Sequence, residues 1–301
     1  MAADILPLFP VHEPVRLLAP AKVNLFLDIL DRRQDGYHNL DAVNVSVDLF
    51  DEIDLRLTED GQFKVECDWP EVPKDDTNHL IRAAKEVLGS SRWGVSMKLK
   101  KRIPVGAGLG GGTADAGTLL RYLARAFNLK EKEVIHRALK VGSDVPYSFY
   151  GGPARARGRG EWVERLEGVH ELDLILLDPG QRHETPRLYA RLPPSDERGH
   201  PPADLFIETW RRGNLELLGL QMFNAFQDIV FAEFPRLAEL RNRLLDAGCL
   251  GVCLTGTGSH LVGLWSRSGS NGEELKWEAE DAKLSRVHTL AREFPGWFQR
   301  L

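Results

Sequence analysis

The fold is decided by the stretch Ile103–Asp115, which reads IPVGAGLGGGTAD and places five glycines in the seven positions 106–112. Glycines lack Cβ atoms and adopt positive φ angles readily, so several backbone N–H groups can point into one concavity. Residues 95–99 before the loop alternate as in a strand, and residues 113–127 after it have helical spacing. Because a helix N-terminus adds N–H donors and partial positive charge, this arrangement favours a bound di- or triphosphate. The alternatives are a mobile loop and tight packing between strand and helix, both without a ligand.

The glycine loop does not match the common nucleotide-binding signatures. No Gly-Lys-Ser/Thr follows it, which excludes a Walker A loop. Gly106, Gly108 and Gly111 formally satisfy G-x-G-x-x-G, but residues 128–131 lie in a helix connection with no strand before them, unlike a dinucleotide site. The His-Arg-Asp and Asp-Phe-Gly motifs of protein kinases do not follow. The loop alone therefore indicates phosphate binding and no particular enzyme class.

Periodicity on both sides of the loop predicts a mixed α+β fold. Alternating patterns predict strands, and apolar residues three and four apart predict helices. The expected strands cover residues 15–29 (as strand, turn and strand), 43–57 (as two strands), 63–67, 95–99, 154–166 (as a hairpin), 172–177, 251–255, 260–265 and 287–290. The expected helices cover residues 78–88, 113–127, 131–140 and 215–248, the last broken near Pro235, with a further helix before residue 287.

Composition places the chain among ordinary globular proteins. Its 301 residues are 43% hydrophobic and 28% charged, which suits about two domains and excludes collagen, coiled coil and wholesale disorder. Three cysteines are too few for a disulfide scaffold and fit a reducing compartment. The net charge of −5 gives no overall basic field, and no apolar run approaches the roughly 18–20 residues that cross a bilayer. We therefore expect a cytoplasmic monomer or homodimer whose partners are neither nucleic acid nor membrane.

Three further motifs indicate which class of phosphate-binding protein the chain resembles. They are APAKVNLFL at residues 19–27 followed by DGYH at 35–38, GSDVP at 142–146 followed by GGPA at 151–154, and TGTGS at 255–259. With these motifs the chain resembles the GHMP small-molecule kinases over roughly residues 15–290. The resemblance is strongest to the branch that phosphorylates the 2-hydroxyl of a cytidine-diphosphate-linked methylerythritol in non-mevalonate isoprenoid synthesis.

The resemblance implies a fold, a cofactor and a catalytic pair. Two α+β domains are expected, an N-terminal nucleotide-binding domain over residues 1–166 and a ferredoxin-like C-terminal domain over residues 167–301, with the site in the cleft between them. ATP and Mg²⁺ are the expected cofactors. The resemblance brings Asp144 together with Lys22: the carboxylate would accept the proton of the attacking hydroxyl, and the ammonium would hold the carboxylate ionised and neutralise the transferring phosphate. The alternatives are a solvated strand lysine and a helix N-cap.

The family resemblance also implies ligand-binding roles for individual residues of this chain. Tyr37 is expected to stack on cytosine with His38 bonding its polar edge, while Tyr189 covers the other face of the base. Asn24 is expected to orient the substrate hydroxyl or diphosphate, and the turn that contains Thr257 to complete the substrate or phosphate pocket. The expected ATP-binding residues are Pro104, Gly106, Gly108, Leu109, Gly110, Gly111, Gly112 and Thr113 for the phosphates, with Asn78 and Lys101 for the base or ribose. Thr113 is also the candidate helix cap and metal ligand.

The chain departs from the family pattern at several positions. Thr113-Ala114-Asp115 replaces the usual Ser-Ser-Asp, Gly256-Thr257-Gly258 replaces Gly-Ser-Gly, and His260 is unusual and unexplained. Two other functions therefore remain open: a GHMP kinase acting on a mevalonate- or homoserine-like substrate, and a nucleotide-binding homologue without catalysis.

Overall fold

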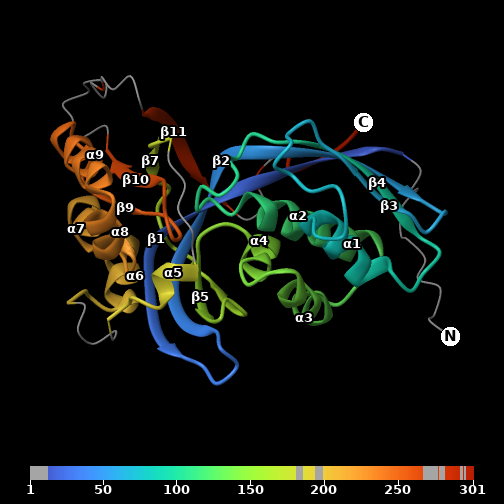
Figure 1. The fold of residues 1–301 in the computed structure, drawn as a ribbon, viewed down its shortest axis with the longest axis horizontal. Coiled ribbons are helices and arrows are strands. Elements are labelled where there is room, and N and C mark those ends of the chain that lie inside the picture. The colour runs from blue at the N-terminus through green and yellow to red at the C-terminus, as the bar shows by residue number, and fades with distance from the viewer. Residues whose placement is uncertain are drawn as a thin grey trace.

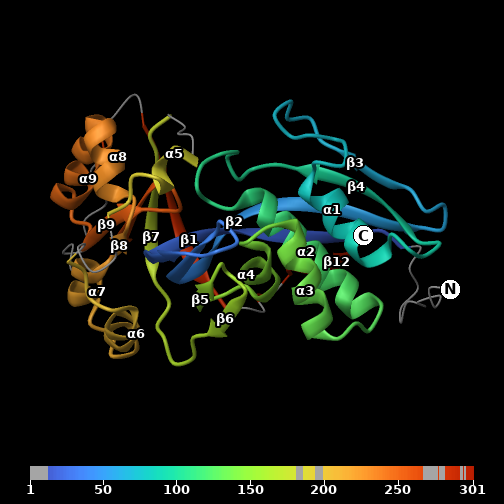
Figure 2. The same cartoon turned by 60° about the horizontal axis from the view of Figure 1, so that its bottom comes forward.

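The computed structural model describes residues 13–180, 186–193, 199–266, 277, 282–291, 294 and 296–301. The described chain forms two lobes joined by long strands (Figure 1). Helices α1–α4 lie in one lobe and α6–α9 in the other, and Figure 2 shows the same separation after rotation.

The two strands that join the lobes are β1 (Val15–Arg32) and β2 (His38–Thr58). They pair antiparallel from Val15 opposite Leu55 to Arg32 opposite His38. The prediction of a turn within residues 15–29, and of two strands within 43–57, was therefore wrong. The register shifts between Pro20 and Ala21, where a bulge accommodates a proline that cannot donate to the sheet and lets the strand continue.

One mixed sheet carries both lobes, in the order β12-β1-β2-β11-β7-β10-β9. Strand β11 lies between β2 and β7, with Thr289 opposite Val47 and Val287 opposite Leu174. The sequence did not predict β12, and the helix expected after residue 272 and before residue 287 falls mainly on residues 273–276 and 278–281, outside the described residues. The other strands are β3 (Phe63–Glu66), β4 (Gly94–Lys100), β5 (Ala154–Gly158), β6 (Trp162–Arg165), β7 (Asp173–Asp178), β8 (Phe223–Asn224), β9 (Gly251–Leu254), β10 (Leu261–Trp265), β11 (Lys283–Leu290) and β12 (Phe298–Arg300).

The helices expected over residues 78–88, 113–127 and 131–140 are present as α1, α2 and α3. The segment expected over residues 215–248 is more divided than predicted, because β8 separates two of its three helices and Phe234 separates the third. The sequence did not predict α4, α5 or α6. The helices are α1 (His79–Leu88), α2 (Gly111–Ala126), α3 (Glu131–Val141), α4 (Val145–Tyr150), α5 (Pro186–Tyr189), α6 (Ala203–Arg211), α7 (Leu215–Gln221), α8 (Gln227–Glu233) and α9 (Pro235–Asp246).

Two groups of buried apolar residues form the cores. The larger group packs β1, β2 and β4 against α1 and α2, and the smaller group lies in the lobe of α8 and α9. The smaller group also includes Leu27, Ile29 and Ala42 from the first two strands. The boundary at residue 166 stays a prediction, because β1 and β2 contribute to both cores. Among the described helices, none combines the length and apolar character needed to cross a membrane.

Candidate active site

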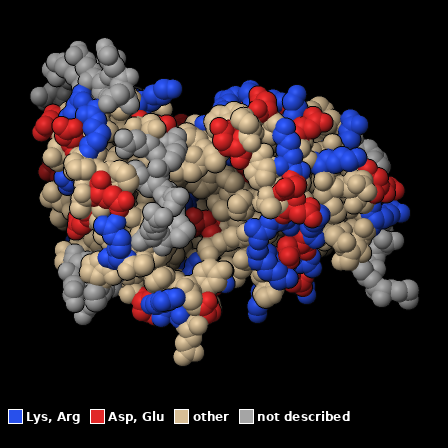
Figure 3. Space-filling view, viewed as in Figure 1, with Lys and Arg blue, Asp and Glu red and all other residues tan. Residues whose placement is uncertain are grey.

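A cavity of about 660 Å³ lies at the junction of the lobes. Its walls come from β1, the glycine loop, α1, α4 and the turn at residues 256–258, and the space-filling view shows a hollow in the middle of this face (Figure 3). A volume of this size is typical of a small-molecule site.

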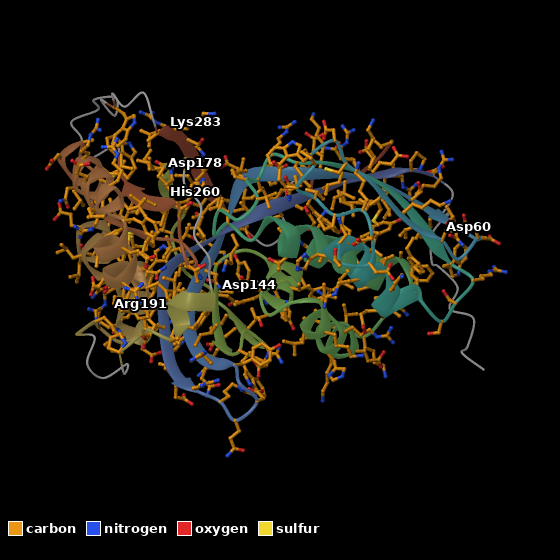
Figure 4. All side chains as sticks on the ribbon, viewed as in Figure 1. Asp60, Asp144, Asp178, Arg191, His260 and Lys283 are labelled. Atoms are coloured by element: carbon orange, nitrogen blue, oxygen red, sulfur yellow. The ribbon has the colours of Figure 1, made fainter. Side chains whose placement is uncertain are left out.

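Lys22 and Asp144 meet at the wall of this cavity. The Nζ atom of Lys22 lies 3.0 Å from Oδ2 of Asp144, and the Lys22 side chain is only 6% exposed, against 40% for Asp144. Asp144 directly precedes α4, as Figure 4 shows, yet its side chain caps no backbone N–H there. Its carboxylate therefore faces the lysine and the cavity, and the alternatives of a solvated lysine and of a capping aspartate do not describe this geometry.

The glycine loop is fixed beside this pair by backbone contacts. The backbone N–H of Lys22 donates to the carbonyl of Leu109 at 2.9 Å. Gly110 has a φ of 66°, and a Cβ there would lie 3.5 Å from Cβ of Lys22. The loop thus places the N-terminus of α2 next to the lysine, where backbone N–H groups and an ammonium can act on the same anion.

Thr113 does not cap α2, contrary to the prediction. The helix begins at Gly111, so Thr113 lies within its first turn, and its hydroxyl donates to the carbonyl of Gly110 at 2.8 Å. The side chain still lines the cavity, and contact with a phosphate or metal stays a prediction. Ala114 is buried in the core and is not among the described residues that line the cavity, so its missing hydroxyl removes no group from the site.

Lys101 belongs to a buried triad beneath the loop. Its Nζ donates to Oδ2 of Asp51 and lies 3.1 Å from Oδ2 of Asp115. Asp51 also accepts the backbone N–H groups of Arg102 and Ile103, at 2.6 and 2.9 Å. Burial raises the pKa of Asp115 to about 8, against the lowering influence of the Lys101 charge. Lys101 lines the cavity, but its charge is directed at these carboxylates, and a contact with base or ribose stays a prediction.

Asn78 forms hydrogen bonds that stabilise the start of helix α1. Its Oδ1 accepts the N–H of Leu80 at 2.8 Å as the N-cap of α1, and its Nδ2 donates to the carbonyl of Pro73 at 2.6 Å.

The neighbouring His79 lines the cavity beside Gly112, and burial and nearby cations lower its pKa, so its ring is neutral at pH 7. Sequence reasoning missed His79, because no motif includes this residue.

Asn24 joins the lobes. Its Oδ1 accepts the N–H of Gly256 at 2.8 Å, its Nδ2 donates to Oδ1 of Asn44, and its backbone N–H donates to Oγ1 of Thr255 at 3.1 Å. Asn24 and Thr257 both line the cavity, so contacts with the substrate remain predictions for both.

The aromatic residues expected around cytosine differ in how close they lie to the cavity. Tyr189 lines the cavity and stacks on His38 at a ring distance of 5.0 Å. Burial, with the nearby Asp144 charge, raises the pKa of Tyr189 to about 12. Tyr37 is half exposed in the turn between β1 and β2, and the guanidinium of Arg159 covers its ring at 3.7 Å. Neither Tyr37 nor His38 is among the described residues that line the cavity, and base stacking stays a prediction.

The predicted ATP-binding residues are largely brought together. Only Leu109 is not among the described cavity-lining residues, since its side chain is buried in the larger core. Those that line the cavity are Pro104, Gly106, Gly108, Gly110, Gly111, Gly112, Thr113, Asn78 and Lys101.

His260 lies elsewhere, buried in the second lobe with its Nε2 3.7 Å from Oδ2 of Asp178 (Figure 4).

Comparison with known proteins identifies the class first. The family described as the GHMP kinases N terminal domain matches residues 78–152, and the family described as GHMP kinases C terminal matches residues 206–278. The fold and the site therefore define a GHMP kinase.

Similarity to whole proteins narrows the assignment. The chain is 32% identical over 284 residues to 4-diphosphocytidyl-2-C-methyl-D-erythritol kinase of Brevibacillus brevis, covering 93% of each chain. It is 36% identical to the kinase of the same name from Desulfotalea psychrophila, covering 84% of this chain and 86% of that one. A solved 4-(cytidine 5'-diphospho)-2C-methyl-D-erythritol kinase superposes with a TM-score of 0.74 at 30% identity, covering 91% of this chain and 98% of that one. The chain belongs to the 4-diphosphocytidyl-2-C-methyl-D-erythritol kinase family.

More distant structures share the fold alone. A homoserine kinase from Cytophaga hutchinsonii superposes with a TM-score of 0.69 at 18% identity, over 95% of this chain and 97% of that one.

Proposed function

We propose that this chain transfers the γ-phosphoryl group of ATP to the 2-hydroxyl of 4-diphosphocytidyl-2-C-methyl-D-erythritol, a step of non-mevalonate isoprenoid synthesis. The observation that carries the proposal is the Lys22–Asp144 ion pair, 3.0 Å between charged atoms, on the wall of the glycine-loop cavity. Phosphoryl transfer needs positioning and charge stabilisation more than covalent chemistry, and these two groups with the loop supply both.

In the proposed reaction, Asp144 accepts the proton of the 2-hydroxyl as its oxygen attacks the γ-phosphorus. A new oxygen–phosphorus bond forms, the bond from the γ-phosphorus to the β–γ bridging oxygen breaks, and ADP leaves. The proton then passes from Asp144 to solvent, which its 40% exposure permits. Lys22 neutralises charge on the transferring group, and the N-terminal turn of α2 binds the remaining phosphates.

Mg²⁺ would enter with the nucleotide. Among the described residues, no group of three or more His, Cys, Asp or Glu side chains can hold a metal. This fits an ion held mainly by phosphate oxygens and water, with the Thr113 hydroxyl as the ligand this chain offers. Bound there, the ion would neutralise charge on the β- and γ-phosphates.

The substrate end of the cavity supports a nucleotide-linked acceptor. Tyr189 lies near Asp144, and His38 stacks on Tyr189, so aromatic rings lie within reach of the catalytic pair. A flat base can stack on such rings, whereas mevalonate or homoserine has no group that needs them.

We further propose that the enzyme works in the cytoplasm as a monomer or homodimer. All three cysteines, Cys67, Cys249 and Cys253, are buried free thiols, which suits a reducing compartment.

An acceptor panel tests the proposed function. ADP release is measured with ATP and, in turn, the cytidyl substrate, mevalonate and homoserine, and phosphorus NMR locates the new phosphate. We expect release with the cytidyl substrate alone and one added phosphomonoester on its 2-hydroxyl. Faster turnover of mevalonate or homoserine would assign a different GHMP activity, and nucleotide binding without ADP release would indicate a homologue without catalysis.

A further inference from the structure

We propose that Asn224 is a positioning residue for phosphoryl transfer: it holds the turn at residues 255–258 against the glycine loop and thereby sets the affinity for ATP. The inference rests on the proposed kinase function. Asn224 is buried at the end of β8 and is not among the described residues that line the cavity, so any effect on the reaction must pass through other residues.

The amide of Asn224 is bonded on every side. Its Nδ2 donates to the carbonyl of Leu254 at 2.9 Å and to the carbonyl of Gly256 at 2.7 Å, and its Oδ1 accepts the N–H of Phe226 at 2.9 Å. The opposite amide orientation would aim an oxygen at two carbonyl oxygens and an NH₂ at an N–H, so the hydrogen bonds define one orientation. Only a side chain with two donors and an acceptor in this geometry serves the position.

The bonded turn lies directly on the glycine loop. A Cβ on Gly108 would meet the carbonyl of Thr255 and would lie 2.9 Å from the carbonyl oxygen of Gly258. Conversely, a Cβ on Gly256 would lie 2.9 Å from the carbonyl oxygen of Gly108. Because the two backbones touch without room for a side chain, a displacement of the turn displaces the loop.

Asn224 also ties this turn to the strand of Lys22. Residue 224 pairs with Leu27 of β1, and the N–H of Ala225 donates to the carbonyl of Leu27 at 2.9 Å. From the same strand, Asn24 accepts the N–H of Gly256 at 2.8 Å. The turn is thus fixed from two sides to β1, the strand that carries Lys22, and the loop takes its position relative to the catalytic pair from that attachment.

The test compares Asn224→Asp and Asn224→Ala with the wild-type enzyme. The aspartate keeps the shape but aims a carboxylate oxygen at two carbonyls, and the alanine removes both donors. Measurements are the affinity for ADP without acceptor, the KM for ATP, the KM for the cytidyl substrate, and the melting temperature. Asn214→Ala is the matched control, because it removes an N-cap of α7 in the same lobe, where Asn214 accepts the N–H of Leu217 at 3.1 Å.

We expect both Asn224 variants to weaken ADP binding and raise the KM for ATP by about tenfold or more, the scale of one or two buried hydrogen bonds, with a smaller change in the KM for the cytidyl substrate. The Asn214 control should lower the melting temperature and leave both KM values unchanged. The Asn224→Asp defect should shrink as pH falls, because a protonated carboxyl regains a donor.

Different results would contradict the positioning role of Asn224 and the proposed kinase function. Unchanged ADP affinity and KM for ATP in folded Asn224→Ala protein would overturn the positioning role, even if the wild-type enzyme is active. If the aspartate variant does not fold, the alanine variant decides alone. A wild-type enzyme that binds ADP but transfers no phosphate would defeat the proposed function, while the ADP affinities would still test Asn224.

Discussion

Replacing Asp144 with Asn probes the catalytic pair with the least change in shape. The amide oxygen can still accept from Lys22, so the cavity keeps its form, but the general base is lost. General-base catalysis contributes a factor of roughly 100–10,000 in rate. At 1.36 kcal/mol per tenfold, this is about 2.7–5.4 kcal/mol of activation free energy.

The effect on stability should be much smaller than the effect on rate. Two unit charges 3.0 Å apart attract by about 5.5 kcal/mol at an effective dielectric of 20. Asp144 is 40% exposed, however, and solvent screens such pairs to about 1 kcal/mol or less of the free energy of unfolding. The variant should therefore unfold within a few degrees of the wild type while its kcat falls at least about 100-fold.

The assay is ADP release at saturating ATP and cytidyl substrate, with unfolding followed by circular dichroism. Asp54→Asn is the control: Asp54 forms two bonds with Arg16, at 2.7 and 2.8 Å, its side chain is 32% exposed, close to the 40% of Asp144, and it is not among the described residues that line the cavity. The control should keep kcat. A kcat for Asp144→Asn within threefold of wild type, in folded protein, would refute the role of general base.

Four further changes test other parts of the account. Lys22→Met should lower kcat at least about 100-fold without lowering the melting temperature, because a buried charge is replaced by an apolar chain of similar length; a lower melting temperature with normal kcat would assign Lys22 a structural role instead. Tyr37→Ala should raise the KM for the cytidyl substrate more than the KM for ATP, and equal changes would count against stacking. Gly108→Ala should raise the KM for ATP about tenfold or more, since its Cβ would lie 2.9 Å from the Gly258 carbonyl at a φ of +77°, whereas Gly61→Ala, with a positive φ but open space, should leave that KM unchanged. Burial raises the pKa of Asp115 to about 8, so the folded state binds a proton more tightly than the unfolded state, and this group's contribution to stability falls as pH rises from about 4 to 8; Asp115→Asn should remove that fall, and parallel urea-unfolding profiles of the two proteins between pH 5 and 8 would contradict it.

The sequence was most informative where backbone chemistry alone restricts the residue. The glycines at 106–112 predicted a phosphate loop between strand and helix, and in the structure α2 begins at Gly111, within this run. The pairing of Lys22 with Asp144 came only from family resemblance, because 122 positions separate the two and no local periodicity joins them. Their 3.0 Å contact fulfils that expectation, while their catalytic roles await measurement.

Several features of the site depend on contacts between residues far apart in the sequence, and local sequence patterns do not reveal such contacts. Asp51 lies between the two alternating runs of residues 43–57, and nothing local indicates that it accepts from the backbone of residues 102 and 103. The sequence predicts a helix around Asn224, yet this residue ends β8 and its hydrogen-bond partners lie 30 and 32 positions away. The turn predicted within residues 15–29 was wrong, because the bulge at Pro20 that keeps β1 continuous depends on pairing with β2, which no local pattern reveals.

A crystal structure of the enzyme with a non-hydrolysable ATP analogue and 4-diphosphocytidyl-2-C-methyl-D-erythritol tests the central claim most directly. We expect the 2-hydroxyl oxygen within about 3 Å of the Asp144 carboxylate and in line with the γ-phosphorus, with the phosphates against the first turn of α2. A hydroxyl bound away from Asp144, or a γ-phosphate outside the reach of Lys22, would contradict it.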